Sequence, residues 1–311
     1  MRDPIEHYRY PEEWIRREIE KLGSKEVKKR IESGLYILTH SRWLKRGITT
    51  GTTASASAVG AITSLFEETD GVKVWTPSDI EVEVKVIAKN GVAVAKKFSG
   101  DHSFDVTNGV EIRAEISKNL DFGEGIGRLN GKPSISNSAM RQILVNIKKA
   151  AEEYRYDGSA MLSVPDGERI WEKTGNRRFG IYRGISILGT TGFVEPWCDE
   201  LVEAKIRIAS LLDKVTLTTG RKGWKWAKEN LPDFEPIVMG VHFDKAIERI
   251  EGEIIIAGLP SLLIKWAFPE LRGKILKGVD PVKFRNRILK KAKEINPNVV
   301  DVILLRDEDA M

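Results

Sequence analysis

The chain has 311 residues, of which 41% are hydrophobic and 31% charged, as in an ordinary globular protein. The net charge of +5 is modest and the basic residues are scattered, which argues against a nucleic-acid partner but suits an anionic small molecule. The single cysteine, Cys198, excludes an intrachain disulfide. With no long apolar run and no secretory leader, we expect no membrane contact and a cytoplasmic protein.

The first half of the chain predicts an N-terminal arm followed by an α+β domain. Residues 11–33 are charged with a partial apolar stripe, which predicts a helix in an arm over residues 1–40. Residues 41–180 mix strands of period-two alternation with helices, the pattern of an α+β domain. Its expected elements are a small-residue helix over 52–66, strands over 81–87, 92–94 and 109–116 with a hairpin turn at Asn90-Gly91, a helix over 139–154 and a strand over 161–164.

Residues 181–311 alternate short apolar strands with helices. This rhythm predicts an α/β domain with a parallel, Rossmann-like sheet covered on both faces. The expected strands are 185–188, 215–219, 237–241, 253–259 and 299–305, and the expected helices are 196–212, 223–230, 244–250, 261–268 and 281–295. Such sheets bind ligands at the carboxyl ends of their strands.

Threonine-glycine turns are the most distinctive motif. Gly-Thr-Thr-Gly stands at 189–192, Thr-Thr-Gly at 218–220, and a related Ile-Thr-Thr-Gly-Thr-Thr at 48–53. Glycine lets backbone N–H groups and hydroxyls approach a ligand closely. By the strand-end rule, the expected cofactor crevice consists of Gly189, Thr190, Thr191, Gly192, Thr218, Thr219 and Gly220.

Familiar phosphate-binding and nucleophile motifs are absent. There is no P-loop and no GxSxG elbow, and GEGIGR at 123–128 lacks the βαβ frame of a dinucleotide fingerprint. That segment is compatible with a binding loop or a flexible hairpin. Asp101, His102 and Asp105 could hold a metal, but Asx-turn capping explains the aspartates more simply, so no protein-bound metal is expected.

Five segments together resemble the CbiD family, the cobalt-precorrin-5B C1-methyltransferases of the anaerobic cobalamin (vitamin B12) pathway. In the family's order they are GITTGTTASAS (47–57), GDHSFDVTNGVEI (100–112), GEGIGR (123–128), GISILGTTGFVEP (184–196) and VTLTTGRKG (215–223). The likeness runs from about Gly47 to Gly240.

The resemblance implies transfer of a methyl group from S-adenosyl-L-methionine to C1 of an anionic corrin precursor, with cobalt present only as part of that substrate. Arginine forks bind carboxylates well, and the substrate carries many. The predicted substrate contacts are Thr49, Thr50, Gly51, Thr52, Arg128, Arg178 and Arg221. Where the macrocycle must lose a proton, the candidate bases are Asp105, Glu124 and Glu195.

Departures from the family pattern leave alternatives open. Thr53 stands where the family usually has cysteine, which excludes a catalytic thiol there, and the segment after Gly240 differs from the family's. The arm before about Arg42 looks additional. The alternatives are a non-catalytic corrinoid- or tetrapyrrole-binding scaffold, a methyltransferase acting on a related tetrapyrrole, and an unrelated nucleotide-dependent α/β enzyme. The sequence is also compatible with a homo-oligomer.

Overall fold

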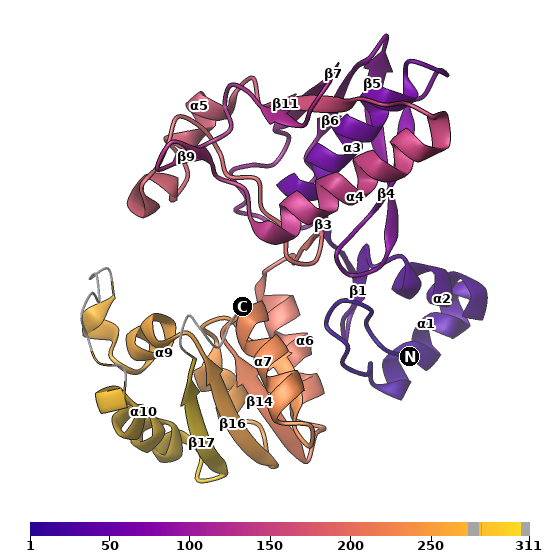
Figure 1. The fold of residues 1–311 in the computed structure, drawn as a ribbon. Helices are drawn as coiled ribbons and strands as arrows, with labels where there is room; N and C mark the ends of the chain where they lie inside the picture. Colours follow the sequence, from indigo (N-terminus) through magenta and orange to yellow (C-terminus); the bar gives the residue numbers. More distant parts are fainter. Residues whose placement is uncertain (273–279, 281, 306–311) are drawn as a thin grey trace. The chain divides into compact units, whose positions relative to one another are not determined.

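The computed structural model describes residues 1–272, 280 and 282–305, which form two compact units (Figure 1). The parallel-sheet unit comprises residues 1–22, 39–41 and the described part of 198–311, and the mixed-sheet unit comprises residues 23–38 and 42–197. Residues 1–40, expected as one arm, are therefore divided between both units. Domain boundaries at residues 40 and 180 stay a prediction, because compactness does not test which segments fold independently.

The mixed-sheet unit is built on a six-stranded sheet of order β4-β5-β6-β7-β11-β8. Neighbouring strands pair antiparallel except β11 and β8, which pair parallel. The elements of this unit are α2 (Ser24–Glu32), β1 (Tyr36–Leu38), β2 (Trp43–Lys45), β3 (Gly47–Ile48), α3 (Thr50–Thr63), β4 (Gly71–Trp75), β5 (Glu81–Lys89), β6 (Val92–Lys96), β7 (Glu111–Ser117), β8 (Asp121–Phe122), β9 (Arg128–Leu129), β10 (Lys132–Pro133), α4 (Asn137–Tyr154), β11 (Ser159–Ser163), α5 (Gly167–Trp171), the 3-10 helix η1 (Asn176–Phe179), β12 (Ile181–Tyr182) and β13 (Phe193–Val194).

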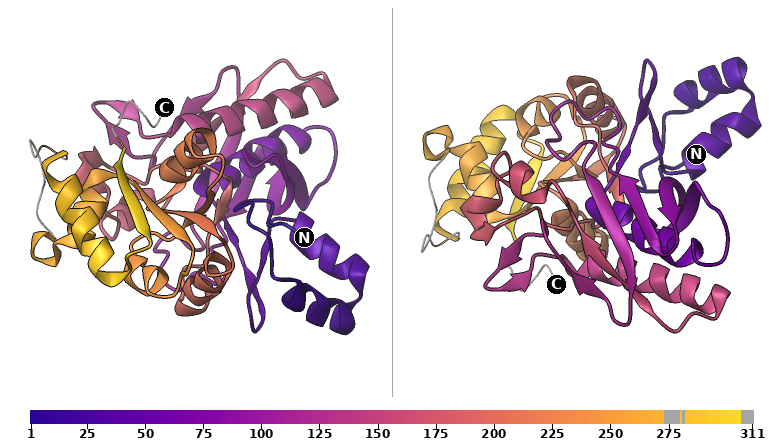
Figure 2. Two further views of the ribbon diagram at one scale, coloured as in Figure 1. Left: turned by 90° about the horizontal axis from the view of Figure 1, so that it is seen from below. Right: turned by 90° about the horizontal axis from the view of Figure 1, so that it is seen from above.

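Helix α3 packs on one face of this sheet and against α4 (Figures 1 and 2). Every residue of α3 is buried, which its alanines, serines and glycines permit because small side chains allow close approach. A Cβ atom on Gly60 would lie 3.1 Å from Cβ of Ala93 on β6. The predicted hairpin is confirmed: Asn90 and Gly91 both have positive φ, and Lys89 pairs with Val92.

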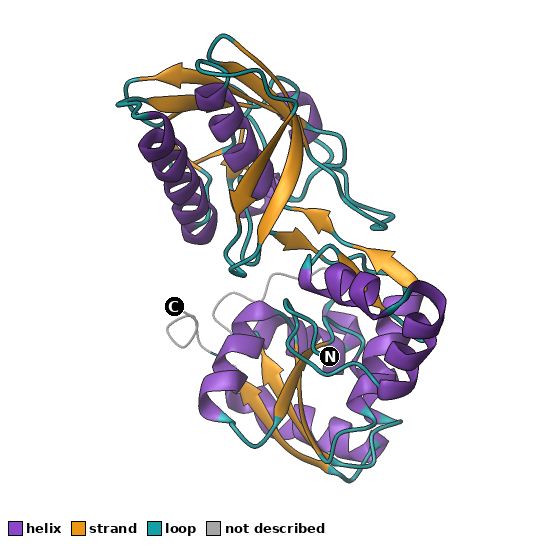
Figure 3. Ribbon diagram, turned by 90° about the vertical axis from the view of Figure 1, so that its right-hand side faces the viewer, coloured by secondary structure: helices purple, strands orange, loops and turns teal. Residues whose placement is uncertain are grey.

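The parallel-sheet unit contains a four-stranded sheet of order β15-β14-β16-β17, in which every neighbouring pair is parallel. Figure 3 shows helices flanking these strands, and the central strands β14 and β16 are buried on both faces. The elements of this unit are α1 (Glu12–Leu22), α6 (Asp199–Ala209), β14 (Lys214–Thr218), α7 (Arg221–Asn230), β15 (Glu235–Val238), α8 (Phe243–Ile247), β16 (Glu253–Gly258), α9 (Pro260–Ala267), the 3-10 helix η2 (Pro269–Leu271), α10 (Val282–Ile295) and β17 (Val299–Leu304).

The strand order of the parallel sheet reverses between β14 and β16. From β14 the chain moves outward to β15, then crosses to form β16 on the other side of β14. Sheets of this kind bind ligands outside the carboxyl ends of the two strands where the order reverses. Those ends lead into Thr218–Gly220 and Gly258–Leu259, so the strand-end rule selects this edge.

Two expected elements are wrong. The single helix over 11–33 is two helices, α1 and α2, because Gly23 adopts a φ of +81° between them. Residues 185–188 are not a strand of the parallel sheet, because they belong to the mixed-sheet unit. There Ile185 and Ile187 are buried but form only single bridges, to Ile126 and Ile135. The Gly-Thr-Thr-Gly turn therefore does not end a strand of the parallel sheet.

The other helices and strands expected in the second half are confirmed to within a few residues. Of the expected helix 281–295, residue 281 lies outside the described residues, as does the stretch from 306 onward. No helix in the described part of the chain is long and apolar enough to span a bilayer.

Candidate functional site

Two threonine-glycine turns far apart in the sequence meet in the mixed-sheet unit. β3 pairs antiparallel with β13, placing Ile48 opposite Phe193. The Thr49 N–H donates to the carbonyl of Gly192 at 3.0 Å, and the Thr52 hydroxyl donates to the same carbonyl at 2.7 Å. The predicted substrate turn and the first predicted cofactor turn thus form one cluster, which we call the paired turns (residues 47–53 and 188–194).

The start of helix α3 holds the second turn in place. Thr49 caps the helix, its hydroxyl accepting from the Thr52 N–H at 3.2 Å. The Gly51 N–H donates to the Leu188 carbonyl at 2.9 Å, and the Leu188 N–H donates to the Thr50 hydroxyl at 2.8 Å. These bonds occupy N–H groups that a bare helix end would leave open to an anion.

The glycines of the second turn serve close packing, and its threonines face outward. A Cβ on Gly189 would lie 2.4 Å from Oγ1 of Thr49. Gly192 has a φ of +87°, and a Cβ there would lie 2.6 Å from Cβ of Thr76. Thr190 is exposed, and half-buried Thr191 accepts the Phe193 N–H at 3.2 Å. The side chains this turn offers to a ligand are therefore Thr190 and Thr191.

Gln142 is a member of the cluster that the sequence analysis missed. From α4 its amide nitrogen donates to Thr52 Oγ1 at 3.0 Å and to the Trp75 carbonyl at 3.1 Å. The side chain is fully buried, and its Oε1 has no hydrogen-bond partner among the described residues. The sequence contained a signal for it. Gln142 lies on the buried stripe of α4, one residue before Ile143, and a polar side chain at a buried position is expected to have a hydrogen-bonding role.

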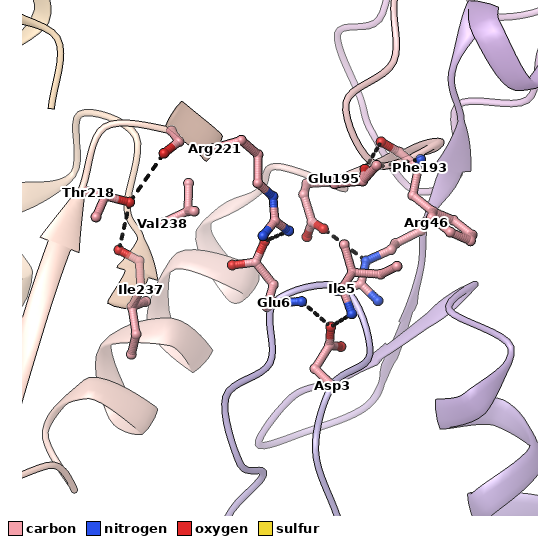
Figure 4. Close-up of polar contacts among 12 residues, drawn as sticks. Asp3, Ile5, Glu6, Arg46, Phe193, Glu195, Thr218, Arg221, Ile237 and Val238 are labelled. Atoms are coloured by element: carbon pink, nitrogen blue, oxygen red, sulfur yellow. Dashed lines mark hydrogen bonds and ion pairs between the residues drawn. The ribbon is translucent and has the colours of Figure 1, made fainter. Parts of the chain in front are cut away.

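The third threonine-glycine turn ends β14 in the parallel-sheet unit. Buried Thr219 accepts the Leu259 N–H at 3.1 Å and so joins the ends of β14 and β16. A Cβ on Gly258 would lie 2.3 Å from Thr219 Oγ1, so glycine is required there. Gly220 differs, because a Cβ at that position would meet no described atom within 4 Å. Unfilled space therefore lies beside Gly220, where the strand order reverses. Thr218 itself donates weakly to the Gly220 and Ile237 carbonyls, at 3.4 Å each (Figure 4).

Arg221, a predicted substrate contact, forms an ion pair inside its own unit (Figure 4). Its Nη2 donates to Glu6 Oε1 at 2.6 Å, and Lys205 Nζ donates to Glu6 Oε2 at 3.2 Å. Glu6 is 1% exposed and Lys205 is fully buried. His7 stacks on Trp224 with ring centroids 5.1 Å apart, and burial, followed by the Arg221 charge, lowers the pKa of His7. A substrate carboxylate would have to compete with Glu6 for Arg221.

Asp105, a candidate base, is held by several donors. It accepts from the Lys97 ammonium, from the Ser99 hydroxyl at 2.8 Å and from the Thr107 N–H at 2.9 Å. Burial alone would raise the pKa of the Asp105 carboxyl, but the hydrogen bonds from Lys97, Thr107 and Ser99 outweigh it and hold that pKa well below its usual range. Such a carboxylate is a weak base at neutral pH, which argues against a proton-accepting role.

The Asx-turn interpretation is confirmed for Asp105 by its bond from the Thr107 N–H. Asp101 accepts the Lys45 N–H at 2.7 Å, and His102 Nδ1 accepts the Phe104 N–H at 3.2 Å. Across the described residues, no three His, Cys, Asp or Glu side chains converge as a metal site would require.

Glu195 and Glu124, the other candidate bases, differ sharply. Glu195 Oε1 accepts from Nε of the fully buried Arg46 at 2.9 Å (Figure 4). Its Oε2 is buried and has no hydrogen-bond partner among the described residues. Glu124 is exposed, and its backbone carbonyl accepts the Val164 N–H at 2.9 Å. Of the three candidates, Glu195 alone has one oxygen held by an arginine and the other buried without a hydrogen-bond partner among the described residues.

Arg128 and Arg178 are both exposed. Arg128 donates to the carbonyls of Phe122 and Gly131 at 3.1 and 3.3 Å, whereas Arg178 lies in η1. The GEGIGR segment before Arg128 bonds to Ile185 in both directions, from the Gly127 N–H to its carbonyl and from its N–H to the Gly125 carbonyl. These backbone bonds tie Gly125 and Gly127 to Ile185, and Arg128 begins a short antiparallel hairpin with Lys132–Pro133. The choice between a binding loop and a flexible hairpin stays a prediction.

The fold places the chain in a recognised class. A mixed-sheet unit carrying paired threonine-glycine turns, together with a parallel-sheet unit, matches a crystal structure of a cobalamin biosynthesis protein (cbiD) from Archaeoglobus fulgidus. The TM-score is 0.85 at 46% sequence identity, and the match covers 98% of this chain and 99% of that one.

The chain belongs to the CbiD family. The CbiD family model matches residues 38–196, which contain four of the five motif segments. A relative from Archaeoglobus fulgidus is 52% identical over 85% of this chain and 87% of its own length. Relatives from Methanosarcina acetivorans and Methanospirillum hungatei are 40% and 36% identical, over 87% and 99% of this chain and 84% and 98% of their own. All three are named cobalt-precorrin-5B C(1)-methyltransferase, so the resemblance found from the motifs is confirmed.

Proposed function

We propose that this protein is a cobalt-precorrin-5B C1-methyltransferase of cobalamin biosynthesis. The observation that carries the proposal is the 52% identity to the Archaeoglobus fulgidus protein of that name across 85% of the chain. The methyl donor is S-adenosyl-L-methionine, and the acceptor is C1 of an anionic corrin precursor that brings its own cobalt.

In this proposal the parallel-sheet unit is a Rossmann-like domain that binds the adenosyl group. The strand order reverses between β14 and β16, and a Cβ on Gly220 would meet no atom of the described residues within 4 Å, which leaves room for a ligand to approach. Thr218 and Thr219 line the same turn, where Thr219 fixes its shape through Leu259. S-adenosyl-L-methionine supplies an electrophilic methyl group on a sulfonium sulfur.

The residues of this chain then have to position the reactants and exclude water, which is where most of the acceleration of such a transfer arises. Exposed Thr190 and half-buried Thr191 offer hydroxyls at the paired turns, and Arg128 and Arg178 offer guanidinium groups to carboxylates. Glu195 is the preferred candidate for holding or accepting a proton. Its Oε2 has no hydrogen-bond partner among the described residues, while Arg46 holds Oε1 in place.

Calorimetric titration with S-adenosylhomocysteine, the transfer product, tests this proposal. The structure offers two discriminating variants: Gly220→Val, which fills open space at extended φ and leaves the fold intact, and Thr190→Val, which alters an exposed side chain of the paired turns. Loss of binding in Gly220→Val with retention in Thr190→Val supports the parallel-sheet site, and the reverse pattern moves the adenosyl group to the paired turns.

A wild-type protein that binds no S-adenosylhomocysteine, alone or with a corrinoid present, contradicts methyl transfer. In that case the non-catalytic scaffold becomes the better hypothesis.

A further inference from the structure

The face of the mixed sheet opposite α3 carries a groove that is lined by none of the predicted cofactor contacts, substrate contacts or candidate bases. Along β5 every second residue is buried against α3, while Glu83, Lys85 and Ile87 point to the other face. Ile87 is 77% exposed, although isoleucine within a strand is usually covered. A groove of about 670 Å³ lies on this face, within the mixed-sheet unit.

The floor of the groove is apolar. Leu35, Ile48, Val94 and Phe98 line it together with Ile87. Phe98 is 40% exposed, and Leu35 and Val94 are partly exposed. A contiguous exposed apolar surface with a polar rim is typical of a binding site rather than of a solvated sheet face.

The rim of the groove carries charges of both signs, with lysines in the majority by one. Lys45, Lys85 and Lys96 line it, against two carboxylates, Asp70 and Glu83. Nζ of Lys45 lies 4.7 Å from the centre of the Phe98 ring, at the edge of the floor. Lys96 pairs with Glu111 at 3.0 Å, but both side chains are largely exposed, and such surface pairs are weak enough for a ligand carboxylate to displace.

The groove reaches the paired turns. Ile48 lines it and directly precedes Thr49, the cap of α3. The Ile48 N–H donates to the Phe98 carbonyl at 2.7 Å, which ties the floor to the strand that leads into the turn. The groove therefore borders the first of the paired turns at Ile48, next to buried Thr49.

We infer that this groove binds the ring of a polycarboxylate tetrapyrrole, an inference that rests on the proposed function. The apolar ring face covers Ile87, Val94 and Phe98, and the carboxylate arms reach Lys85 and Lys96 at the rim. The apolar floor stabilises the bound ring whether its side chains are carboxylates or carboxamides. The lysines at the rim favour the ring whose side chains are charged carboxylates.

The test compares two cobalt corrinoids by absorbance titration: one with all side chains as free carboxylates, and one with the same ring and carboxamide side chains. The variant Lys85→Glu/Lys96→Glu should bind the carboxylate form about tenfold more weakly or worse, the factor that losing one charge-assisted contact brings. Binding of the amide form should change little. Ile87→Asp should weaken both forms, because it disrupts the floor.

The matched control is Lys148→Glu/Lys149→Glu on α4, which changes the net charge equally at two exposed lysines outside the groove. It should leave both titrations unchanged. Equal weakening in the two double variants, or no weakening in either, overturns the groove as the site while the proposed function stands. A wild-type protein that binds neither corrinoid contradicts the proposed function itself.

Sedimentation at the titration concentrations tests whether a second copy of the chain, rather than a ligand, covers this face. An unchanged mass in Ile87→Asp supports the ligand groove. A dimer that this substitution dissociates would overturn the inference, because the face would then be an interface between two copies of the chain.

Discussion

The Thr52 hydroxyl donates to the Gly192 carbonyl across 140 residues of sequence, at a distance of 2.7 Å. Thr52 also accepts from buried Gln142, so one side chain joins α3, α4 and the turn before β13. The motif threonines consequently divide into two groups. Thr49 and Thr52 are buried and hold the paired turns together, whereas Thr190 is exposed and available to a ligand.

Replacing Thr52 by valine should destabilise the protein by about 1–3 kcal/mol, because the Gly192 carbonyl and the Gln142 amide each lose a buried partner. Urea unfolding measures the loss. Thr53→Val is the matched control, since Thr53 is equally buried but its hydroxyl, among the described residues, bonds only to the Thr49 carbonyl, which also accepts the Thr53 N–H. Equal losses in the two variants would show that the contact between the turns contributes nothing specific.

Gly192→Ala should cost more stability than Gly131→Ala. Both glycines have positive φ, +87° and +77°, so alanine strains the backbone in each by about 1–2 kcal/mol. At Gly192 the new methyl group also overlaps Thr76, which adds about 1–3 kcal/mol, whereas at Gly131 it meets no atom of the described residues within 4 Å. Thermal denaturation of both variants gives the difference directly, and similar melting temperatures would contradict the predicted overlap.

Glu6→Gln should destabilise the protein by about 3 kcal/mol or more, because it removes the buried carboxylate that pairs with the buried Lys205 ammonium. Glu203→Gln is the comparison, since Glu203 pairs with Arg207 and Arg249 at the surface and should cost at most about 1 kcal/mol. Chemical denaturation of the full chain measures both. A Glu6→Gln loss no larger than that of Glu203→Gln would contradict a specific stabilising role of the buried Glu6–Lys205 pair.

The Asp105 carboxylate should make stability fall in acid. Its pKa is lower in the folded than in the unfolded chain, so its contribution is present above the unfolded value of about 3.9 and is lost as the pH falls toward the folded value. Asp105→Asn should therefore be less stable than wild type at pH 6, and the gap should close as the pH drops below about 4. Denaturation midpoints of both proteins from pH 6 to pH 2 test this, and a gap independent of pH would contradict the ion pair with Lys97.

The sequence by itself determined whatever depends on neighbouring residues. Alternation along Glu81–Ile87 and the Asn90-Gly91 turn specified a hairpin, because side chains of a strand alternate between its faces and this dipeptide favours positive φ. The motif segments also identified the family, since their order is a property of the chain alone. The apolar strands after Val215 likewise specified a buried, parallel sheet.

Only the tertiary structure decided which distant segments meet. Ile185 and Ile187 alternate as in a strand. An apolar pattern predicts that these side chains are buried, but it does not predict which part of the protein covers them. They pack in the mixed-sheet unit beside Ile126 and Ile135, which places the Gly-Thr-Thr-Gly turn against Thr49, whereas Thr218 belongs to the other unit. Likewise Glu6 meets Lys205 across 199 residues, a charge pairing that no local pattern encodes because burial of both groups arises only when the chain has folded.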